Sequence, residues 1–391
     1  MKIILERKKL LESITRVHAI VEKRNIMPIL EHVKIDISND KISFITTDLD
    51  VIIRDKFKVV FDGDISFTVS VQQIHDITKK FSKSEYVELD LSKVDSGQIG
   101  ISAGQGKVTL PCLNPHEFPS FDVMDSFSSF QVESHLLRRI LLKTKHAMST
   151  GDMRYYLNGI NLKTEDDYLT AAATDVHRLA ISSIYKPTGL DITTGIIIPK
   201  KTVTEIIKMT EQLKDEDMLT VNISENRISL EVNNTTLVSK LINGKYPNYS
   251  GIFSIKPDKI FSIDIAELEN AVELVSAIAE GKIKVINLSL LGSVLTVSSD
   301  SNKDGKHSSA QQEILVESSW VDADGNKIHS HDIISISFML NSKYLLDVLS
   351  ICNGPRIYFK LSTESAPLIV KDTADVNSQY VLMPMQIDIN T

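Results

Sequence analysis

One pattern of residues occurs three times along the chain, and this repeat constrains the fold more than any other feature. A Leu-Leu pair, a Thr-Asp pair and an aromatic-Pro pair each recur after 126 to 128 residues: Leu10-Leu11 and Leu136-Leu137, Thr47-Asp48 and Thr174-Asp175, Phe118-Pro119 and Tyr246-Pro247. Ser299-Asp300 and Pro384 continue the series into a third copy. Solenoid repeats are roughly 20 to 50 residues long, so a period this long indicates three repeated domains.

The three copies share one order of helices and strands, which predicts an α+β fold. Apolar residues at helical spacing mark a first helix around Leu10 to Val21 in copy one, and again at 135–148 and 266–278. The second helix of each copy is expected at 71–81, 199–209 and 341–352. Two helices would therefore lie on a mostly antiparallel sheet in each copy.

The strands predict hairpins and domain limits. Alternating residues on either side of Asn39-Asp40 and of Glu225-Asn226 are typical of β-hairpins. In the third copy, a polar stretch at 301–332 adds about ten residues to the period and is expected to form a lengthened hairpin or a loop. We expect domain boundaries near residues 127 and 255, which give the domains 1–126, 127–254 and 255–391.

Composition favours a globular protein of the cytoplasm. Hydrophobic residues make up 42% and charged residues 24% of the 391 residues, as in ordinary soluble domains. Cys112 and Cys352 lie far apart without a CxxC partner, so neither a disulfide framework nor a thiolate zinc site is expected. The start, MKIILERKKLLESI, lacks the apolar core of a signal peptide, and no stretch is apolar enough to span a membrane. We therefore expect no membrane partner.

Basic residues gather on the predicted helices of the first two copies, although the formal net charge is −8. They lie off the apolar stripe, for example at Lys79-Lys80 and Arg138-Arg139, whereas Glu267 stands in the first helix of copy three. A solvated surface explains such charges on any single helix. Their repetition over four helices favours a surface that contacts nucleic-acid phosphates without reading base sequence.

Enzyme motifs are incomplete or have a structural explanation. The segment GQGKVT at 104–109 has Ile101 and Val108 where a phosphate-binding P-loop needs Gly and Ser or Thr. Asp175 and His177 have the chemistry of an acid–base pair, which leaves a hydrolase as one hypothesis. The Asp recurs in every copy, however, and this favours a turn whose carboxylate accepts backbone N–H groups. We expect no catalytic residue, no metal site and no cofactor.

Five segments, in chain order, resemble the bacterial β clamp, the β subunit of DNA polymerase III: MRYYLNG (153–159), ATDVHRLA (173–180), IPKK (198–201), GKYPNY (244–249) and YVLMPM (380–385). The resemblance implies three domains of DNA-clamp fold, with helices lining a ring and antiparallel sheets outside. Two chains would join head to tail and encircle double-stranded DNA. The family has no catalytic activity of its own; it is an accessory subunit that tethers the replicative DNA polymerase for processive synthesis.

The resemblance also implies three sets of functional residues. A hydrophobic groove for the polymerase catalytic subunit, the clamp loader and other clamp-binding-motif proteins would be formed by Leu157, Thr174, His177, Arg178, Leu179, Pro247, Ile252, Val381, Met383, Pro384 and Met385. The DNA-binding positions would be Arg24, Tyr155, Tyr156, Lys200 and Lys201. At the dimer contact, Lys107 and Val108 of one chain would meet Ala277 and Ile278 of the other. Val176 and Gly251 depart from the family pattern, which usually has Gly and Arg there, so the peptide preference stays open.

An alternative function is a repeat-built scaffold that binds proteins and never encircles DNA. The repeat and the apolar surfaces suit both functions, because a repeat and an apolar surface can each occur with or without a closed ring. The two hypotheses differ in one measurable property. A ring is retained on circular DNA and slides off linear DNA, whereas a scaffold treats the two templates alike.

Overall fold

The computed structural model describes residues 1–22, 27–119, 128–254, 256–303, 306–321, 327–328 and 333–385, and it divides into two compact units. Unit 1 comprises Met1–Arg138, Pro187–Asp191 and Lys201–Ile242. Unit 2 comprises Arg139–Lys186, Ile192–Lys200 and Asn243–Thr391. The expected domain limits near residues 127 and 255 lie outside the described residues.

Unit 1 contains two antiparallel sheets. The smaller sheet has the order β1 (Lys2–Glu6), β6 (Tyr86–Asp90), β7 (Gln98–Ala103) and β8 (Gly106–Pro111). The larger has the order β5 (Ile65–Ser70), β2 (His32–Ser38), β3 (Lys41–Thr47), β4 (Val51–Lys58), β16 (Thr235–Lys240), β15 (Arg227–Val232), β14 (Met218–Ile223) and β9 (Ser128–Glu133). The pairing of β4 with β16 makes one sheet of strands from copies one and two.

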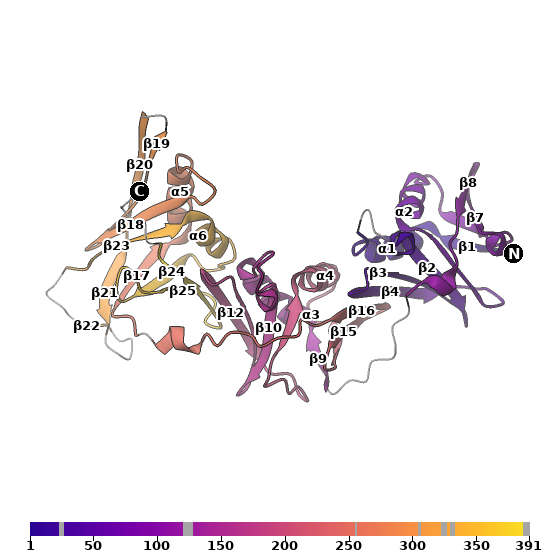
Figure 1. Ribbon diagram of the computed structural model, residues 1–391, viewed down its shortest axis with the longest axis horizontal. Coiled ribbons are helices and arrows are strands. Elements are labelled where there is room, and N and C mark those ends of the chain that lie inside the picture. The colour runs from indigo at the N-terminus through magenta and orange to yellow at the C-terminus, as the bar shows by residue number, and fades with distance from the viewer. Residues whose placement is uncertain are drawn as a thin grey trace. The chain divides into compact units, whose positions relative to one another are not determined.

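The helices of copy one lie side by side, as Figure 1 shows for α1 (Arg7–His18) and α2 (Val71–Lys80). Leu10, Ile14 and Val17 of α1 are fully buried, as their helical spacing predicts. The predicted extension to Val21 is wrong, because the helix ends at His18 and the Val21 N–H donates to the His18 carbonyl in a turn. Apolar spacing reports burial, and burial continues past the end of this helix.

The helices of copy two begin where the sequence predicts them. They are α3 (Ser134–Thr144), which is followed by a short 3-10 helix at Lys145–Ala147, and α4 (Lys200–Glu211). Each first turn follows directly on a strand, β9 for α3 and β13 for α4. Both helices carry the predicted basic residues in their sequence, including Arg138 and Lys208.

Unit 2 also contains two antiparallel sheets. The larger has the order β13 (Ile196–Pro199), β10 (Gly159–Glu165), β11 (Tyr168–Thr174), β12 (Arg178–Tyr185), β26 (Ser378–Leu382), β25 (Leu368–Asp372), β24 (Arg356–Leu361), β17 (Lys259–Asp264), β21 (Glu317–Val321) and β22 (Lys327–Ile328). The smaller has the order β20 (Lys306–Leu315), β19 (Val294–Lys303), β18 (Val285–Leu291) and β23 (Ser335–Asn341). Helices α5 (Ile265–Ser276) and α6 (Ser342–Leu349) pack against each other.

Both predicted hairpins and the lengthened hairpin of copy three are confirmed. Asn39 and Asp40 have φ angles of 50° and 56°, the left-handed conformation that tight two-residue hairpin turns require. The hairpin at Glu225-Asn226 joins β14 to β15. In copy three, β19 and β20 pair over ten residues each and take up much of the polar stretch. The α+β prediction with antiparallel sheets therefore holds in both units.

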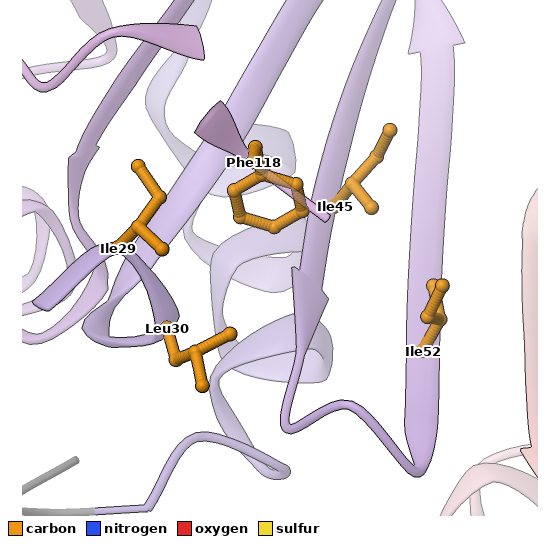
Figure 2. Close-up of a cluster of buried hydrophobic side chains, with 5 residues drawn as sticks. All are labelled: Ile29, Leu30, Ile45, Ile52 and Phe118. Atoms are coloured by element: carbon orange, nitrogen blue, oxygen red, sulfur yellow. The ribbon is translucent and has the colours of Figure 1, made fainter. Parts of the chain in front are cut away.

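Five buried hydrophobic side chains of copy one pack together. Figure 2 shows Phe118 beside Ile45 of β3, with Ile52 on the neighbouring strand β4 and Ile29 and Leu30 on a 3-10 helix. All five side chains are buried. The aromatic residue of the repeated aromatic-Pro pair is therefore part of the core that anchors the end of this copy.

Candidate functional site

The repeated Thr-Asp pair forms the turn between β11 and β12. The Asp175 Oδ1 atom accepts hydrogen bonds from the backbone N–H groups of His177 (3.1 Å) and Arg178 (3.0 Å). Thr174 Oγ1 accepts from the Val176 N–H at 3.0 Å and donates to the Arg178 carbonyl at 2.6 Å. The prediction of a structural turn is thus confirmed at Asp175, since this carboxylate satisfies backbone donors. For copy three the prediction is wrong, because the lengthened hairpin continues the strand: Ser299 and Asp300 lie within β19 and pair with β20.

Copy one contains the same turn between β3 and β4. Asp48 Oδ1 accepts from the N–H groups of Asp50 (3.0 Å) and Val51 (2.7 Å), and Thr47 bonds the backbone as Thr174 does. The middle residue is left-handed in both copies, with φ of 78° at Leu49 and at Val176. A left-handed conformation favours glycine, so Val176 occupies a position that glycine would adopt at lower cost.

Arg178 links this turn to helix α6. Its Nε donates to Asp175 Oδ2 at 3.0 Å, and its Nη1 donates to Asp347 Oδ2 at 2.6 Å. The guanidinium also lies 4.1 Å from the centre of the Tyr344 ring. Burial is the main cause that raises the pKa of the Tyr344 hydroxyl. Arg178 is buried and engaged on three sides, so it positions the turn and presents little free charge.

An apolar cluster lies on the same sheet, where β12, β26 and β25 run side by side. Val381 is directly opposite both Leu179 and Ile369 in the strand register. These three side chains are buried, and the partly buried side chains packed against them are Ile181, Tyr249, Ile252 and Phe253. We call these seven residues the apolar cluster. The structure thus brings the predicted groove residues Leu179, Val381 and Ile252 together.

The C-terminal segment continues along the turn. The Met383 N–H donates to the His177 carbonyl at 2.9 Å, and the Met385 N–H donates to the Met339 carbonyl at 2.8 Å. Met383 is 37% exposed, and Pro384 and Met385 are partly buried. The segment is therefore held at backbone positions, which leaves its side chains at the surface.

The remaining predicted groove residues differ in their exposure. Leu157 is buried, Thr174 is partly buried, and His177 and Pro247 are exposed. The Thr174 N–H donates to the Tyr246 hydroxyl at 2.9 Å. Sequence reasoning missed Ile369 and Tyr249 of the apolar cluster. The short apolar run LIV at 368–370, which directly follows Pro367, is the signal that could have indicated a buried strand carrying Ile369.

Those predicted DNA-binding residues that the structure describes lie on a 3-10 helix and at the start of α4. Tyr155 and Tyr156 lie on a 3-10 helix with their ring centres 5.9 Å apart. Lys200 Nζ donates to Thr150 Oγ1 at 2.6 Å. Arg24 lies outside the described residues.

Lys201 is already held by two carboxylates. Its ammonium forms ion pairs with Glu22, at 2.6 Å, and with Asp48 of the copy-one turn. Burial lowers the pKa of Lys201, but its hydrogen bonds to Asp48 and Glu22 outweigh this, and the net shift is upward. The ammonium therefore stays charged and serves to join α4 to the turn of copy one.

The predicted dimer residues lie at the margins of the two small sheets. Lys107 and Val108 are on β8, which is the outermost strand of its sheet. Ala277 and Ile278 directly follow α5, and Ala277 is exposed. The small sheet of unit 2 ends in β20, which contacts α5. Both small sheets thus end in a strand whose outer edge has no strand partner among the described residues.

Over the described ranges, no group of three or more His, Cys, Asp or Glu side chains is placed to hold a metal ion. In the same part of the chain, no helix is long and apolar enough to cross a membrane.

Comparison with known proteins gives a match along the whole chain. Family models of the DNA polymerase III beta subunit match the N-terminal domain at residues 1–122, the central domain at 131–248 and the C-terminal domain at 251–386. The beta sliding clamp of Caulobacter vibrioides is 30% identical over 391 residues, which is 99% of this chain and 100% of that protein.

Solved structures of the same kind share the fold. A sliding clamp from Bartonella birtlesii, bound to griselimycin, has a TM-score of 0.89 at 29% identity. The beta subunit from Pseudomonas aeruginosa has a TM-score of 0.88 at 26% identity. In both comparisons the match covers 99% of this chain and 100% of the other. The chain therefore belongs to the DNA polymerase III beta subunit family, the beta sliding clamps.

Proposed function

We propose that two copies of this chain join head to tail into a ring that encircles duplex DNA and tethers the replicative polymerase to its template. The observation that carries this proposal is the match of three clamp-domain models, in order, over nearly the whole chain. We assign the three domains to 1–126, 127–254 and 255–391. As a clamp, the chain is an accessory subunit of the polymerase and contributes no catalytic group.

Ring closure would use the outer edges of the two small sheets. An edge strand presents unpaired N–H and C=O groups, which are a template for a strand of another chain. A contact between β8 of one chain and the β20 side of the other is head to tail, and two such contacts close a ring if the rotation fits. Lys107 and Val108 would then approach Ala277 and Ile278 of the second chain.

Contact with DNA would be electrostatic and independent of base sequence. Tyr155, Tyr156, Lys200 and Arg24 are the residues that we assign to it, and Lys201 contributes least because Glu22 and Asp48 already bind its ammonium. A closed ring is held on DNA by topology, so a weak phosphate contact is sufficient. A net charge of −8 is compatible with such a ring, since strong attraction would slow sliding.

Partner proteins would dock in a groove formed by the apolar cluster and the C-terminal segment. Leu179, Val381 and Ile369 form its buried base, and the partly buried Ile181, Tyr249, Ile252 and Phe253 would offer an apolar surface to an extended segment of a partner. Met383 adds a flexible, polarizable wall that adapts to different side chains. We assign to this groove the polymerase catalytic subunit, the clamp loader and other proteins with a clamp-binding motif.

Retention on circular DNA tests the ring directly. The labelled chain is loaded by its cognate clamp loader onto a nicked circular plasmid, separated from free protein by gel filtration, and then treated with a restriction enzyme that cuts the plasmid once. We expect the protein to remain on the circle and to leave the linear product. Equal retention on both forms would favour the scaffold that does not encircle DNA. We also propose that the protein is cytoplasmic and associates with the nucleoid during replication. Retention of the labelled protein on the chromosome in cells would support this location.

A charge placed on the exposed groove wall tests partner docking. We expect Met383→Glu to weaken binding of a polymerase-derived peptide at least tenfold, because the carboxylate would be desolvated against the apolar cluster. Met218→Glu is the matched control, since Met218 is exposed on β14 of unit 1. Equal loss in both variants, or in neither, would argue against the groove.

A further inference from the structure

A row of exposed aromatic and acidic side chains lies on the sheet that carries the apolar cluster. Glu165 of β10 is directly opposite Tyr168 of β11, which is directly opposite Tyr185 of β12. The two tyrosine rings stack with centres 5.2 Å apart and planes 22° from parallel. Tyr185 is 76% exposed and Tyr168 37%. We call Glu165, Tyr168 and Tyr185 the tyrosine row.

The tyrosine row and the apolar cluster share one face of the sheet. Residues two apart along a strand point to the same side, so Leu179, Ile181 and Tyr185 of β12 all face the same way. Tyr249 is one of the partly buried members of the apolar cluster. Burial and, after it, the charge of Glu165 raise the pKa of the Tyr249 hydroxyl to about 12. The strand register thus places the tyrosine row and the apolar cluster on one face of β12, six residues apart along the strand.

Acidic groups outnumber basic groups around the row. Glu165 is paired with Lys163 at 2.5 Å. Asp166 and Asp167 are exposed in the turn that follows, and Lys186 comes directly after β12. The residues of the row and those close to it in the sequence thus carry three carboxylates and two ammonium groups. Exposed aromatic rings beside net negative charge attract a cationic side chain, which can lie over a ring while its charge is neutralised nearby.

We propose that the tyrosine row binds an arginine side chain of the same partner segment that inserts its apolar residues into the cluster. This inference rests on the proposed groove and extends it with a second, cationic position. From Leu179 to Tyr185 is six residues of strand, or about 20 Å at about 3.3 Å per residue. An extended partner segment covers this distance with about six residues. Guanidinium suits the position better than ammonium because its planar group stacks on aromatic rings.

Peptide binding to the dimer tests the cationic position. The probes are synthetic peptides with a five-residue anchor of two leucines and a phenylalanine among serines, labelled for fluorescence anisotropy. One peptide is the anchor alone. The others add a five-serine spacer and a terminal arginine, on the N-terminal side or on the C-terminal side, or glutamine or phenylalanine in place of that arginine.

We expect one of the two arginine peptides to bind two- to fivefold tighter than the anchor alone, the equivalent of about 0.5–1 kcal/mol for an exposed cation–π contact. Tyr185→Ala and Glu165→Gln should abolish the gain without changing the affinity of the anchor peptide. Tyr358→Ala is the matched control, because Tyr358 is a partly exposed tyrosine of β24 in the same sheet, and it should retain the gain.

The outcomes separate this inference from the proposed groove. If the anchor peptide binds, but neither arginine peptide gains affinity or Tyr185→Ala retains the gain, the cationic position is refuted and the groove stands. An equal gain with glutamine or phenylalanine would refute the preference for a cation. If the anchor peptide itself fails to bind the native dimer, the groove and its extension are both refuted.

Discussion

Because Val176 has a left-handed backbone conformation, we predict that glycine at this position gives a more stable protein than alanine, the reverse of the usual order. Val176 has φ of 78° and is half-exposed, in a turn fixed by Thr174 and Asp175 through backbone hydrogen bonds. A left-handed conformation costs a residue with a Cβ atom about 1–2 kcal/mol. Glycine avoids this cost but loses about 0.5–1 kcal/mol relative to alanine through the greater entropy of the unfolded chain. The balance at position 176 favours glycine over alanine by about 0.5–1 kcal/mol.

Comparing glycine with alanine at the same position removes the effect of the lost valine side chain. We expect Val176→Gly to be more stable than Val176→Ala. Val376 is the control, because it is an exposed valine in a turn and its φ is not positive. At that position the entropy term alone remains, so Val376→Ala should be more stable than Val376→Gly by about 0.5–1 kcal/mol.

Urea unfolding followed by tryptophan fluorescence suits this measurement. Trp320 is the one tryptophan of the chain and lies on β21. Trp320 and Val176 both belong to unit 2, so the fluorescence of Trp320 reports the unfolding of the unit that carries the substitution. For a slope of about 2–3 kcal/mol per molar urea, the expected difference shifts the midpoint by about 0.3 M. If Val176→Ala were the more stable of the pair, as at the control position, the turn would not impose a left-handed conformation.

Three further predictions concern buried polar groups. Asp55 is buried and accepts a 2.6 Å hydrogen bond from Thr235 across the β4–β16 seam, so Asp55→Ala should cost about 2–4 kcal/mol in urea unfolding; a cost below 0.5 kcal/mol would contradict this. Burial lowers the pKa of His146 to about 3, so the folded state disfavours protonation of this imidazole and the free energy of unfolding falls as the pH drops from about 6.5 toward 3. His146→Gln should flatten that pH dependence. An unchanged pH profile would refute the role of His146 in it. Tyr246→Phe leaves the Thr174 N–H without its 2.9 Å acceptor and should cost about 1 kcal/mol, whereas a neutral result in the same unfolding assay would show that another group replaces it.

Local sequence patterns predicted most of the fold because they depend on neighbouring residues. The spacing of Leu10, Ile14 and Val17 identified a buried helical face, and Asn39-Asp40 identified a hairpin turn. The end of the first helix was missed because apolar spacing records burial and cannot distinguish a helix from a packed turn. Helix ends depend on capping and on tertiary packing, which have weaker signals.

The candidate site could be predicted only in part, because it depends on strand register. Val381 meets Leu179 and Ile369 through pairings between β26, β12 and β25, and the first of these pairings joins segments about 200 residues apart in sequence. Family motifs indicated Leu179 and Val381, but no local pattern places Tyr249 against them. Lys201 shows the same limit for charge. Its position on a helix indicates a free cation, and only the fold reveals its ion pairs with two carboxylates.

The Thr-Asp turns of copies one and two each take part in a contact with the following copy, through different cationic residues. In copy one, Asp48 is bonded by Lys201, which α4 of the next copy supplies. In copy two, Asp175 is bonded by Arg178 of its own turn, and Arg178 reaches Asp347 of the next copy. Each turn therefore joins its copy to the one that follows, at the β4–β16 seam or at the β12–β26 seam. The joining contacts are ion pairs of Lys201 and Arg178 with carboxylates. The exposed side chains beside the seam in copy two, His177 and Met383, take no part in these ion pairs. If partners dock in the proposed groove, substitutions of His177 and Met383 should alter docking without weakening the link between successive copies.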